Sequence, residues 1–282
     1  MRASRRRFIR ASGVALGGSL LAGRARAAVP ANETLATIAK LRTIHGDFSD
    51  KPISDQNLET ILGASVRAAN ASAFQSYSIV VVRDPAMQRT VCGYRGSCLL
   101  LYLADFTRIL ATGKRLGHEY DPGNMEAFVT ASTNTILAAQ TAVIAAKSLG
   151  IDSLLTNGVH RGDMERLWTK LELPRKYCFP LIALVLGYAA KEPGYLKGRL
   201  KGPGVVHQGT YHNVTDAEAD AIVRQYDDKT LHLGLNEDWD QKGHKHYLDW
   251  LHKEWLGRGR KPGETQISAR LRQAGFVESA GS

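Results

Sequence analysis

Four short apolar runs alternate with helical segments in the middle of the chain. The runs are too short to be buried helices and are rich in leucine and β-branched residues, so they predict central strands at 76–83, 97–105, 151–155 and 179–187. Apolar periodicity predicts helices at 33–42, 54–66, 123–148 and 163–172. This order of elements predicts a mixed α/β core in which helices cover a sheet.

The longest helical segment, 123–148, carries an unusual face of small side chains. Gly150 follows it and fits a left-handed cap. Small side chains let a neighbouring element approach closely, either within the core or across a dimer. The face consists of Ala131, Ala138, Ala139, Ala142, Ala145 and Ala146.

The amino terminus has the pattern of an export signal. Residues 1–27 hold seven arginines and no acidic residue. The segment SRRRFIR (4–10) precedes a short apolar stretch and the small-x-small site Ala25-Arg26-Ala27. This arrangement resembles a bacterial twin-arginine signal, which implies recognition by the twin-arginine export machinery, cleavage after Ala27 and a periplasmic location. A basic leader or an uncleaved anchor is the alternative, although a membrane span needs about 20 apolar residues.

Charge and cysteine content exclude several classes of protein. The formal charge of the whole chain is +10, but removal of the seven arginines of the signal leaves +3 from Ala28 onward. That value gives no support for a nucleic-acid partner, and no stable membrane insertion is expected. Three cysteines do not make a disulfide framework. Buried thiols are favoured for Cys92, Cys98 and Cys178, and a Cys92–Cys98 disulfide is the alternative.

The common nucleotide-binding and hydrolase motifs do not occur in the sequence, but four blocks in a fixed order do resemble a known family. KLRTIHGDFSDKPISDQNLETIL contains Arg42, and RAANASAFQSYSIVVVRDP contains Gln75. LGIDSLLTNGV (149–159) and GYLKGRL (194–200) follow. Together the blocks resemble the signatures of the FMN-dependent nitroreductase family. Leu41, Ala73 and Ser76-Tyr77 depart from the family pattern.

The resemblance implies an α+β fold, with a mixed β-sheet flanked by helices, assembled as a homodimer. Residues 28–204 would form the FMN-binding domain, and residues 205–282 a C-terminal extension that packs on the core or on the partner subunit. Aromatic residues of the extension, together with one leucine, predict an apolar face: Trp239, Tyr247, Trp250, Leu251 and Trp255. Its histidines lack the spacing of a metal site.

The resemblance also assigns candidate residues for the FMN phosphate. Arg42, Lys197 and Arg199 would supply charge-assisted donors, and Thr43 a hydroxyl donor. Lys197 and Arg199 are two residues apart, so an extended backbone would project both to one side. The alternative is a solvated basic patch.

Other candidates would contact the flavin ring and its ribityl chain. Asn70 and Ala71 would lie against both, and Asn157 and Gly158 near N5, where glycine permits a close backbone approach. Asn134 would contact the ring edge, or would be a core or capping asparagine. His45 takes the place of a cation near the pyrimidine edge; we hypothesise that it couples the flavin potential to pH, and the alternative is a loop histidine with no role.

The implied activity is ping-pong hydride transfer from a reduced donor such as NAD(P)H to a nitroaromatic, quinone or similar acceptor. Because the flavin carries this chemistry, no catalytic side chain and no metal is expected. The alternative is an exported flavin-carrying binding or electron-relay protein that turns over no small substrate.

Overall fold

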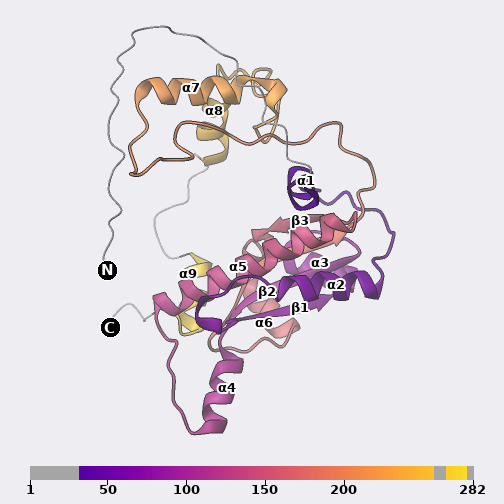
Figure 1. Ribbon diagram of the computed structural model, residues 1–282, viewed down its shortest axis with the longest axis vertical. Helices are drawn as coiled ribbons and strands as arrows, with labels where there is room; N and C mark the ends of the chain where they lie inside the picture. Colours follow the sequence, from indigo (N-terminus) through magenta and orange to yellow (C-terminus); the bar gives the residue numbers. More distant parts are fainter. Residues whose placement is uncertain (1–31, 257–264, 278–282) are drawn as a thin grey trace, which may run out of the picture.

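The computed structural model describes residues 32–256 and 265–277. The predicted signal, residues 1–27, lies outside the described residues. A four-stranded sheet with the order β1-β2-β4-β3 forms the centre of the molecule (Figure 1). Its strands are β1 (Tyr77–Val82), β2 (Cys98–Asp105), β3 (Asp152–Thr156) and β4 (Cys178–Gly187). All four predicted strands are therefore confirmed.

The strand directions differ from the expected mixed sheet. All pairings among the four strands are antiparallel. Strands β2 and β3 run in the same direction, but β4 lies between them and pairs with both. Within the described residues, parallel pairing is limited to an isolated bridge between Thr43 and Ser153 at the β3 edge.

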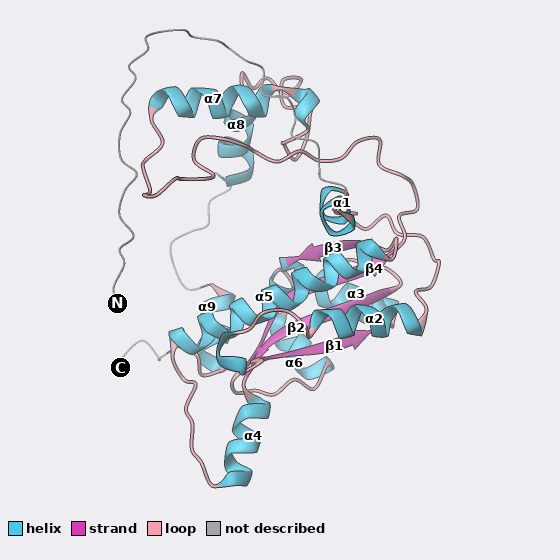
Figure 2. Cartoon of the chain, in the orientation of Figure 1, coloured by secondary structure: helices cyan, strands magenta, loops and turns pink. Residues whose placement is uncertain are grey.

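Helices cover both faces of the sheet. Each strand contributes to the core on both faces, because its side chains alternate between them. On one face, Leu100 and Tyr102 of β2 pack with α2 (Asp55–Ser65) and α5 (Met125–Ser148). On the other face, Leu99 and Leu101 belong to a core that includes buried residues of α3 (Pro85–Cys92), α6 (Met164–Lys170) and α9 (Gln266–Gln273). Figure 2 shows the sheet between these helical layers.

Helix α5 uses its small residues inside the subunit. Ala138, Ala139, Ala142 and Ala146 are fully buried in the core that the helix shares with the sheet. By length and composition alone α5 could span a membrane, but this face is occupied by the sheet. Gly150 follows the helix with φ +72°, so the predicted left-handed cap is confirmed. Of the two alternatives for the small face, packing within the core is the one observed.

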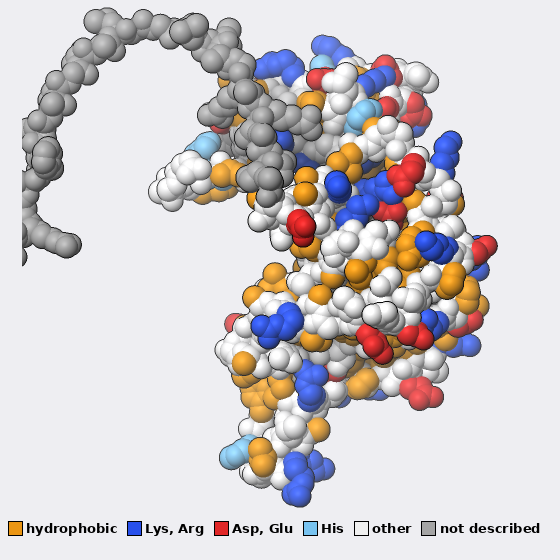
Figure 3. Space-filling view, turned by 45° about the vertical axis from the view of Figure 1, so that its right-hand side comes forward, with side chains coloured by type: hydrophobic (Ala, Val, Ile, Leu, Met, Phe, Trp, Pro, Cys, Tyr) orange, Lys and Arg blue, Asp and Glu red, His pale blue; other side chains and the backbone are white. Residues whose placement is uncertain are grey.

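An arm extends from the core after β4. It contains α7 (Asp216–Asp227), η3 (Lys229–Leu231), α8 (Tyr247–Trp250) and η4 (Leu251–Leu256), and it stands apart from the sheet in Figure 1. Thr215 and Glu218 form a capping box at the start of α7. The arm has its own apolar cluster of Trp239, Tyr247 and Trp250. In the space-filling view the arm and the core appear as two bodies joined by a narrower region (Figure 3).

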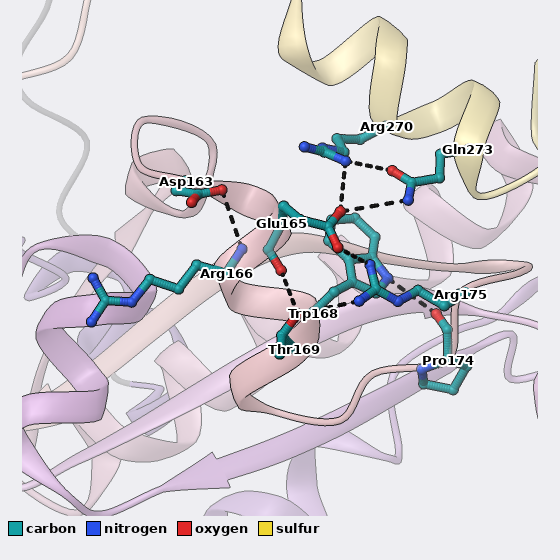
Figure 4. Close-up of polar contacts among 9 residues, drawn as sticks. All are labelled: Asp163, Glu165, Arg166, Trp168, Thr169, Pro174, Arg175, Arg270 and Gln273. Carbon is teal, nitrogen blue, oxygen red and sulfur yellow. Dashed lines mark hydrogen bonds and ion pairs between the residues drawn. The ribbon is translucent and has the colours of Figure 1, made fainter.

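Helix α9 returns the chain to the core. Its Leu271 and the following Ala274 and Phe276 are buried in the main cluster. Arg270 Nη1 donates to Glu165 Oε2 of α6 at 2.7 Å, and Figure 4 shows this contact beside those of Gln273 and Arg175. The C-terminal extension thus comprises an arm and a segment that completes the core.

Three further helices were not expected from the sequence: α3, α4 (Thr107–Leu116) and α9. Helix α4 has no buried residue and projects from the end of the core opposite the arm (Figure 1). Helix α1 (Glu33–Ala39) and the 3-10 helices η1 (Ala71–Ala73) and η2 (Asn157–His160) complete the described elements. The three cysteines are free and buried, as favoured from the sequence.

Candidate functional site

The segment that contains Arg42 is attached to the edge of the sheet. Thr43 forms its parallel bridge with Ser153 of β3, and Ile44 N donates to Ser153 O at 3.0 Å. Ile44 is buried, whereas Thr43 and His45 on either side are exposed. This alternation presents the two predicted binding side chains to solvent on the same side.

A cavity of about 400 Å³ lies beside this segment. That volume is within the range of small-molecule sites, roughly 300–1,000 Å³. Thr43 and His45 line one wall, and residues 191–194 line the other. Lys191 and Glu192, which the sequence did not single out, are therefore neighbours of two predicted residues.

Arg42 is the centre of an ion-pair cluster at the same place. Its Nε and Nη2 donate to the two oxygens of Asp152, each at 2.8 Å, and its Nη1 donates to Glu192 Oε2 at 2.5 Å. Hydrogen bonds to Glu192 and Asp152 raise the pKa of Arg42, which keeps the guanidinium charged. Lys147 Nζ, from the last turn of α5, donates to Asp152 Oδ1 at 2.9 Å.

Asp152 is a buried carboxylate that organises this cluster. Burial raises the pKa of its carboxyl, but hydrogen bonds and charges from Arg42 and Lys147 outweigh burial, so the pKa of Asp152 lies below its usual value. Its side chain is 6% exposed. Asp152 therefore fixes the edge of the Arg42 guanidinium that is formed by Nε and Nη2.

The loop that contains Asn70 and Ala71 lies elsewhere, before β1. Ser72, Ala73 and Gln75 have φ values of +52°, +56° and +46°, a left-handed region in which non-glycine residues are strained. Asn134 holds this loop in place: its Oδ1 accepts from Ala71 N at 2.8 Å, and its Nδ2 donates to Ser76 Oγ at 2.9 Å.

Both ends of the Asn134 amide are therefore used within the protein, and the residue is 1% exposed. Asn70 Oδ1 accepts from Gln75 N, so Asn70 also stabilises the loop. In this structure both asparagines shape the backbone of the loop that the sequence assigned to ribityl and ring contacts.

The 3-10 helix η2 places Asn157 and Gly158 after β3. Asn157 is exposed, and Gly158 is buried with its N–H donating to Thr156 Oγ1 at 3.0 Å. A Cβ at position 158 would lie 2.4 Å from the carbonyl oxygen of Cys92. Close packing against the end of α3 is therefore a physical reason for this glycine that the sequence did not indicate.

Lys197 and Arg199 lie at the base of the arm. Lys197 Nζ donates to the carbonyl of Gly234, and Arg199 Nη1 donates to the carbonyl of Gly198 at 2.7 Å. Gly198 N contacts His232 O, which joins this segment to the chain after η3. The three predicted phosphate cations are thus divided between the core, which holds Arg42, and the arm.

No protein-family model matches the chain. Among curated proteins it is 28% identical over 195 residues to the FMN reductase (NADPH) of Bacillus subtilis, covering 66% of this chain and 77% of that protein. It is 27% identical over 235 residues to the oxygen-insensitive NADPH nitroreductase of Salmonella typhimurium, covering 75% and 93%.

A nitroreductase structure from Bacillus subtilis superposes with a TM-score of 0.73 at 23% identity, covering 86% of this chain and 98% of that one. The chain has the nitroreductase fold. The superposed share exceeds what residues 28–204 alone contribute, so the nitroreductase fold extends into the segment that the sequence separated as a C-terminal extension.

The chemistry of the cavity suits a phosphorylated cofactor on this nitroreductase fold. Its lining offers the Lys191 ammonium, the Thr43 hydroxyl group and the His45 ring beside the carboxylates of Asp47 and Glu192, and Arg42 adjoins it through Glu192. A phosphate dianion binds well to such charge-assisted donors. Sequence reasoning missed Asp152 and Lys147. Their opposite charges lie at the two ends of the connection from α5 to β3, which is a weak signal of an ion pair. Lys191 and Glu192 had none.

Proposed function

We propose that this protein is an FMN-dependent oxidoreductase of the nitroreductase type. It takes reducing equivalents from a nicotinamide donor such as NADPH and passes them to a nitroaromatic, quinone or similar acceptor. The observation that carries the proposal is the cavity lined by Thr43, His45 and Lys191, next to Arg42, on a fold that superposes on a nitroreductase. The similarity to an FMN reductase and to a nitroreductase supports the same cofactor and reaction.

The side chains bind and orient the cofactor, while bound FMN supplies the hydride chemistry. Arg42, Thr43 and Lys191 hold the phosphate, and Asp152 keeps the Arg42 guanidinium in position. The loop of Asn70 and Ala71 presents a rigid backbone because the Asn134 side chain accepts a hydrogen bond from Ala71 N. The hypothesis that His45 couples the flavin potential to pH remains a prediction; His45→Gln would then change the pH slope of the midpoint potential.

The active form is a homodimer, and the separation of the candidate residues on one subunit supports this. The loop of Asn70 and Ala71 precedes Tyr77, which pairs with Ala104 at one end of the sheet. Asp152, beside Arg42, pairs with Gly187 at the other end and on the opposite edge strand. Along β4 the two positions are eight residues apart, or about 26 Å at roughly 3.3 Å per residue.

Helix α5 gives a second measure of this separation. Asn134 contacts the loop and Lys147 contacts Asp152, and these residues are about 20 Å apart at roughly 1.5 Å per helical residue. One flavin that touches both regions would need them from two different subunits. A composite site therefore explains why the candidates do not meet on one chain.

Mixed dimers test the composite site. Lys191→Glu repels the phosphate on one side of the proposed site, and Ala71→Trp obstructs the other side. We expect each homodimer to bind FMN poorly. A heterodimer of the two, isolated with two affinity tags, should bind one FMN per dimer because one of its two sites is unaltered. A heterodimer without FMN would contradict a site shared between subunits.

The reaction itself is tested by absorbance. Purified protein should absorb near about 450 nm, as bound flavin does. Anaerobic mixing with NADPH should bleach this band, and a nitroaromatic or quinone should restore it. A flavin that stays oxidised supports the alternative, an electron-relay protein. A colourless protein that refuses added FMN contradicts the proposal altogether.

We also propose export through the twin-arginine route, supported by the SRRRFIR segment and the Ala25-Arg26-Ala27 site. Replacement of Arg5 and Arg6 by lysine should leave the protein in the cytoplasmic fraction. The unaltered chain should lose residues 1–27 and fractionate with periplasmic markers. Retention of both forms in the cytoplasm would contradict this assignment.

A further inference from the structure

Arg42 has two carboxylate partners that differ sharply in burial. The side chain of Asp152 is 6% exposed, whereas that of Glu192 is 78% exposed. Asp152 takes the edge formed by Nε and Nη2, and Glu192 takes the edge formed by Nη1 and Nη2 at 2.5 and 3.0 Å. The guanidinium thus has a buried inner edge and an accessible outer edge.

The inner edge is fixed because Asp152 depends on it. This carboxylate also accepts from Lys147 Nζ at 2.9 Å and from Ala189 N at 3.4 Å, so it is fully engaged. Removing Arg42 from Asp152 would leave a buried anion with fewer partners, which is strongly unfavourable. Any exchange of partners at Arg42 therefore takes place on the outer edge.

The outer edge carries an ionised but exchangeable partner. The hydrogen bond from Arg42 lowers the pKa of Glu192, so its carboxylate is negative at neutral pH. Exposed ion pairs of this kind contribute little to stability, because water solvates both groups when they separate. Rotation of the Glu192 side chain into solvent is enough to free the outer edge.

A phosphate competes for the same donors. The guanidinium presents a planar fork that binds carboxylate and phosphate oxygens in the same two-point manner. Glu192 and the neighbour of Arg42, Thr43, both line the cavity of about 400 Å³. The Glu192 carboxylate therefore lies at the border of the proposed cofactor site.

The charge of the cluster changes when Glu192 leaves. Arg42, Lys147, Asp152 and Glu192 together are neutral, since two cations balance two anions. Without Glu192 the remaining three carry one net positive charge, which favours a phosphate dianion. With Glu192 in place, a phosphate would meet a cluster that has no net positive charge.

We infer that Glu192 is an internal competitor of the cofactor phosphate: it occupies the outer edge of Arg42 and must be displaced for a phosphate to bind to that edge. This inference rests on the proposed function, because it takes the cavity to be the FMN site. Glu192 thereby sets the affinity for the phosphorylated flavin without contacting the ring.

Binding of two flavins to Glu192→Gln tests this inference. The full chain is stripped of flavin, and dissociation constants for FMN and riboflavin are measured by fluorescence quenching. We expect Glu192→Gln to bind FMN about threefold to tenfold more tightly than the unaltered protein, because a neutral amide competes weakly for a guanidinium. Riboflavin, which has no phosphate, should bind equally to both.

Glu59→Gln is the matched control, since Glu59 is an exposed carboxylate on α2 whose loss changes the net charge equally. It should leave the affinity for FMN unchanged. Unchanged or weaker FMN binding by Glu192→Gln, or an equal gain for riboflavin, would overturn the role of Glu192 while leaving the flavin site intact. Failure of every form, including the unaltered protein, to bind either flavin would instead refute the proposed function.

Discussion

Asp152→Asn is expected to destabilise the protein substantially, because Asp152 is the common counterion of two partly buried cations. The side chains of Arg42 and Lys147 are 19% and 17% exposed. Breaking a buried ion pair from one side costs about 3–5 kcal/mol. Arg42 keeps Glu192 and both cations reach some water, so we expect a loss of about 2–3 kcal/mol in the free energy of unfolding.

Urea unfolding at pH 7, followed by tryptophan fluorescence, measures this loss. Asp50→Asn is the matched control, because Asp50 pairs with Arg95 while its side chain is 87% exposed. That change should stay within about 0.5 kcal/mol of the unaltered protein. If the two variants were equally stable, the argument that Asp152 organises the cluster would be wrong.

The same variant has a predictable pH dependence. The pKa of Asp152 is lowered in the folded protein, so its contribution to stability is complete above the unfolded value of about 4. The contribution is lost as pH falls through the lower folded pKa. The stability difference between the unaltered protein and Asp152→Asn should therefore narrow below pH 4, and a constant difference would contradict the charge-based explanation.

Three further predictions concern packing, the strained loop and the thiols. Gly158→Ala places a methyl group 2.4 Å from Cys92 O and should lower the free energy of unfolding in urea by about 1–3 kcal/mol. Gly162→Ala has open space around its new methyl group and should leave this free energy unchanged. Equal effects of the two variants would contradict the close packing at Gly158. Asn134→Ala leaves Ala71 N without its partner and should cost about 1–3 kcal/mol and speed limited proteolysis of residues 70–76; unchanged cleavage would argue against this role of the asparagine. Burial raises the pKa of the thiols of Cys92, Cys98 and Cys178, that of Cys98 to about 11. None of them should therefore react with a thiol reagent at pH 8 until urea is added. Rapid labelling of the native protein would contradict their burial.

The sequence predicted the elements whose signals are local. The four strands are apolar runs bounded by turns, and α5 is long and periodic, so all were found within two residues of their ends. Helix α3 was missed although Asp84 caps it and Pro85 begins it. Helix α4 was missed although its sequence is amphipathic and its Ile109 and Leu110 pack, partly buried, against the main core.

The sequence predicted only those parts of the site that lie within one short segment. Arg42, Thr43 and His45 are brought together by their own short segment. Asp152 and Glu192 are 110 and 150 residues from Arg42 in the sequence, and the bridge of Thr43 to Ser153 together with the pairing of β3 with β4 brings both to it. Local patterns carry no information about such long-range charge compensation.

Helix α9 determines when this chain can finish folding. The sheet is complete once Gly187 has been synthesised, but the main core still lacks Leu271, Ala274 and Phe276. Synthesis proceeds from the amino terminus, so an apolar gap persists while α9 and Phe276 are still inside the ribosome. The nascent protein therefore exposes part of its interior until α9 has emerged, and a premature stop anywhere in the arm would yield a product with a permanently open core.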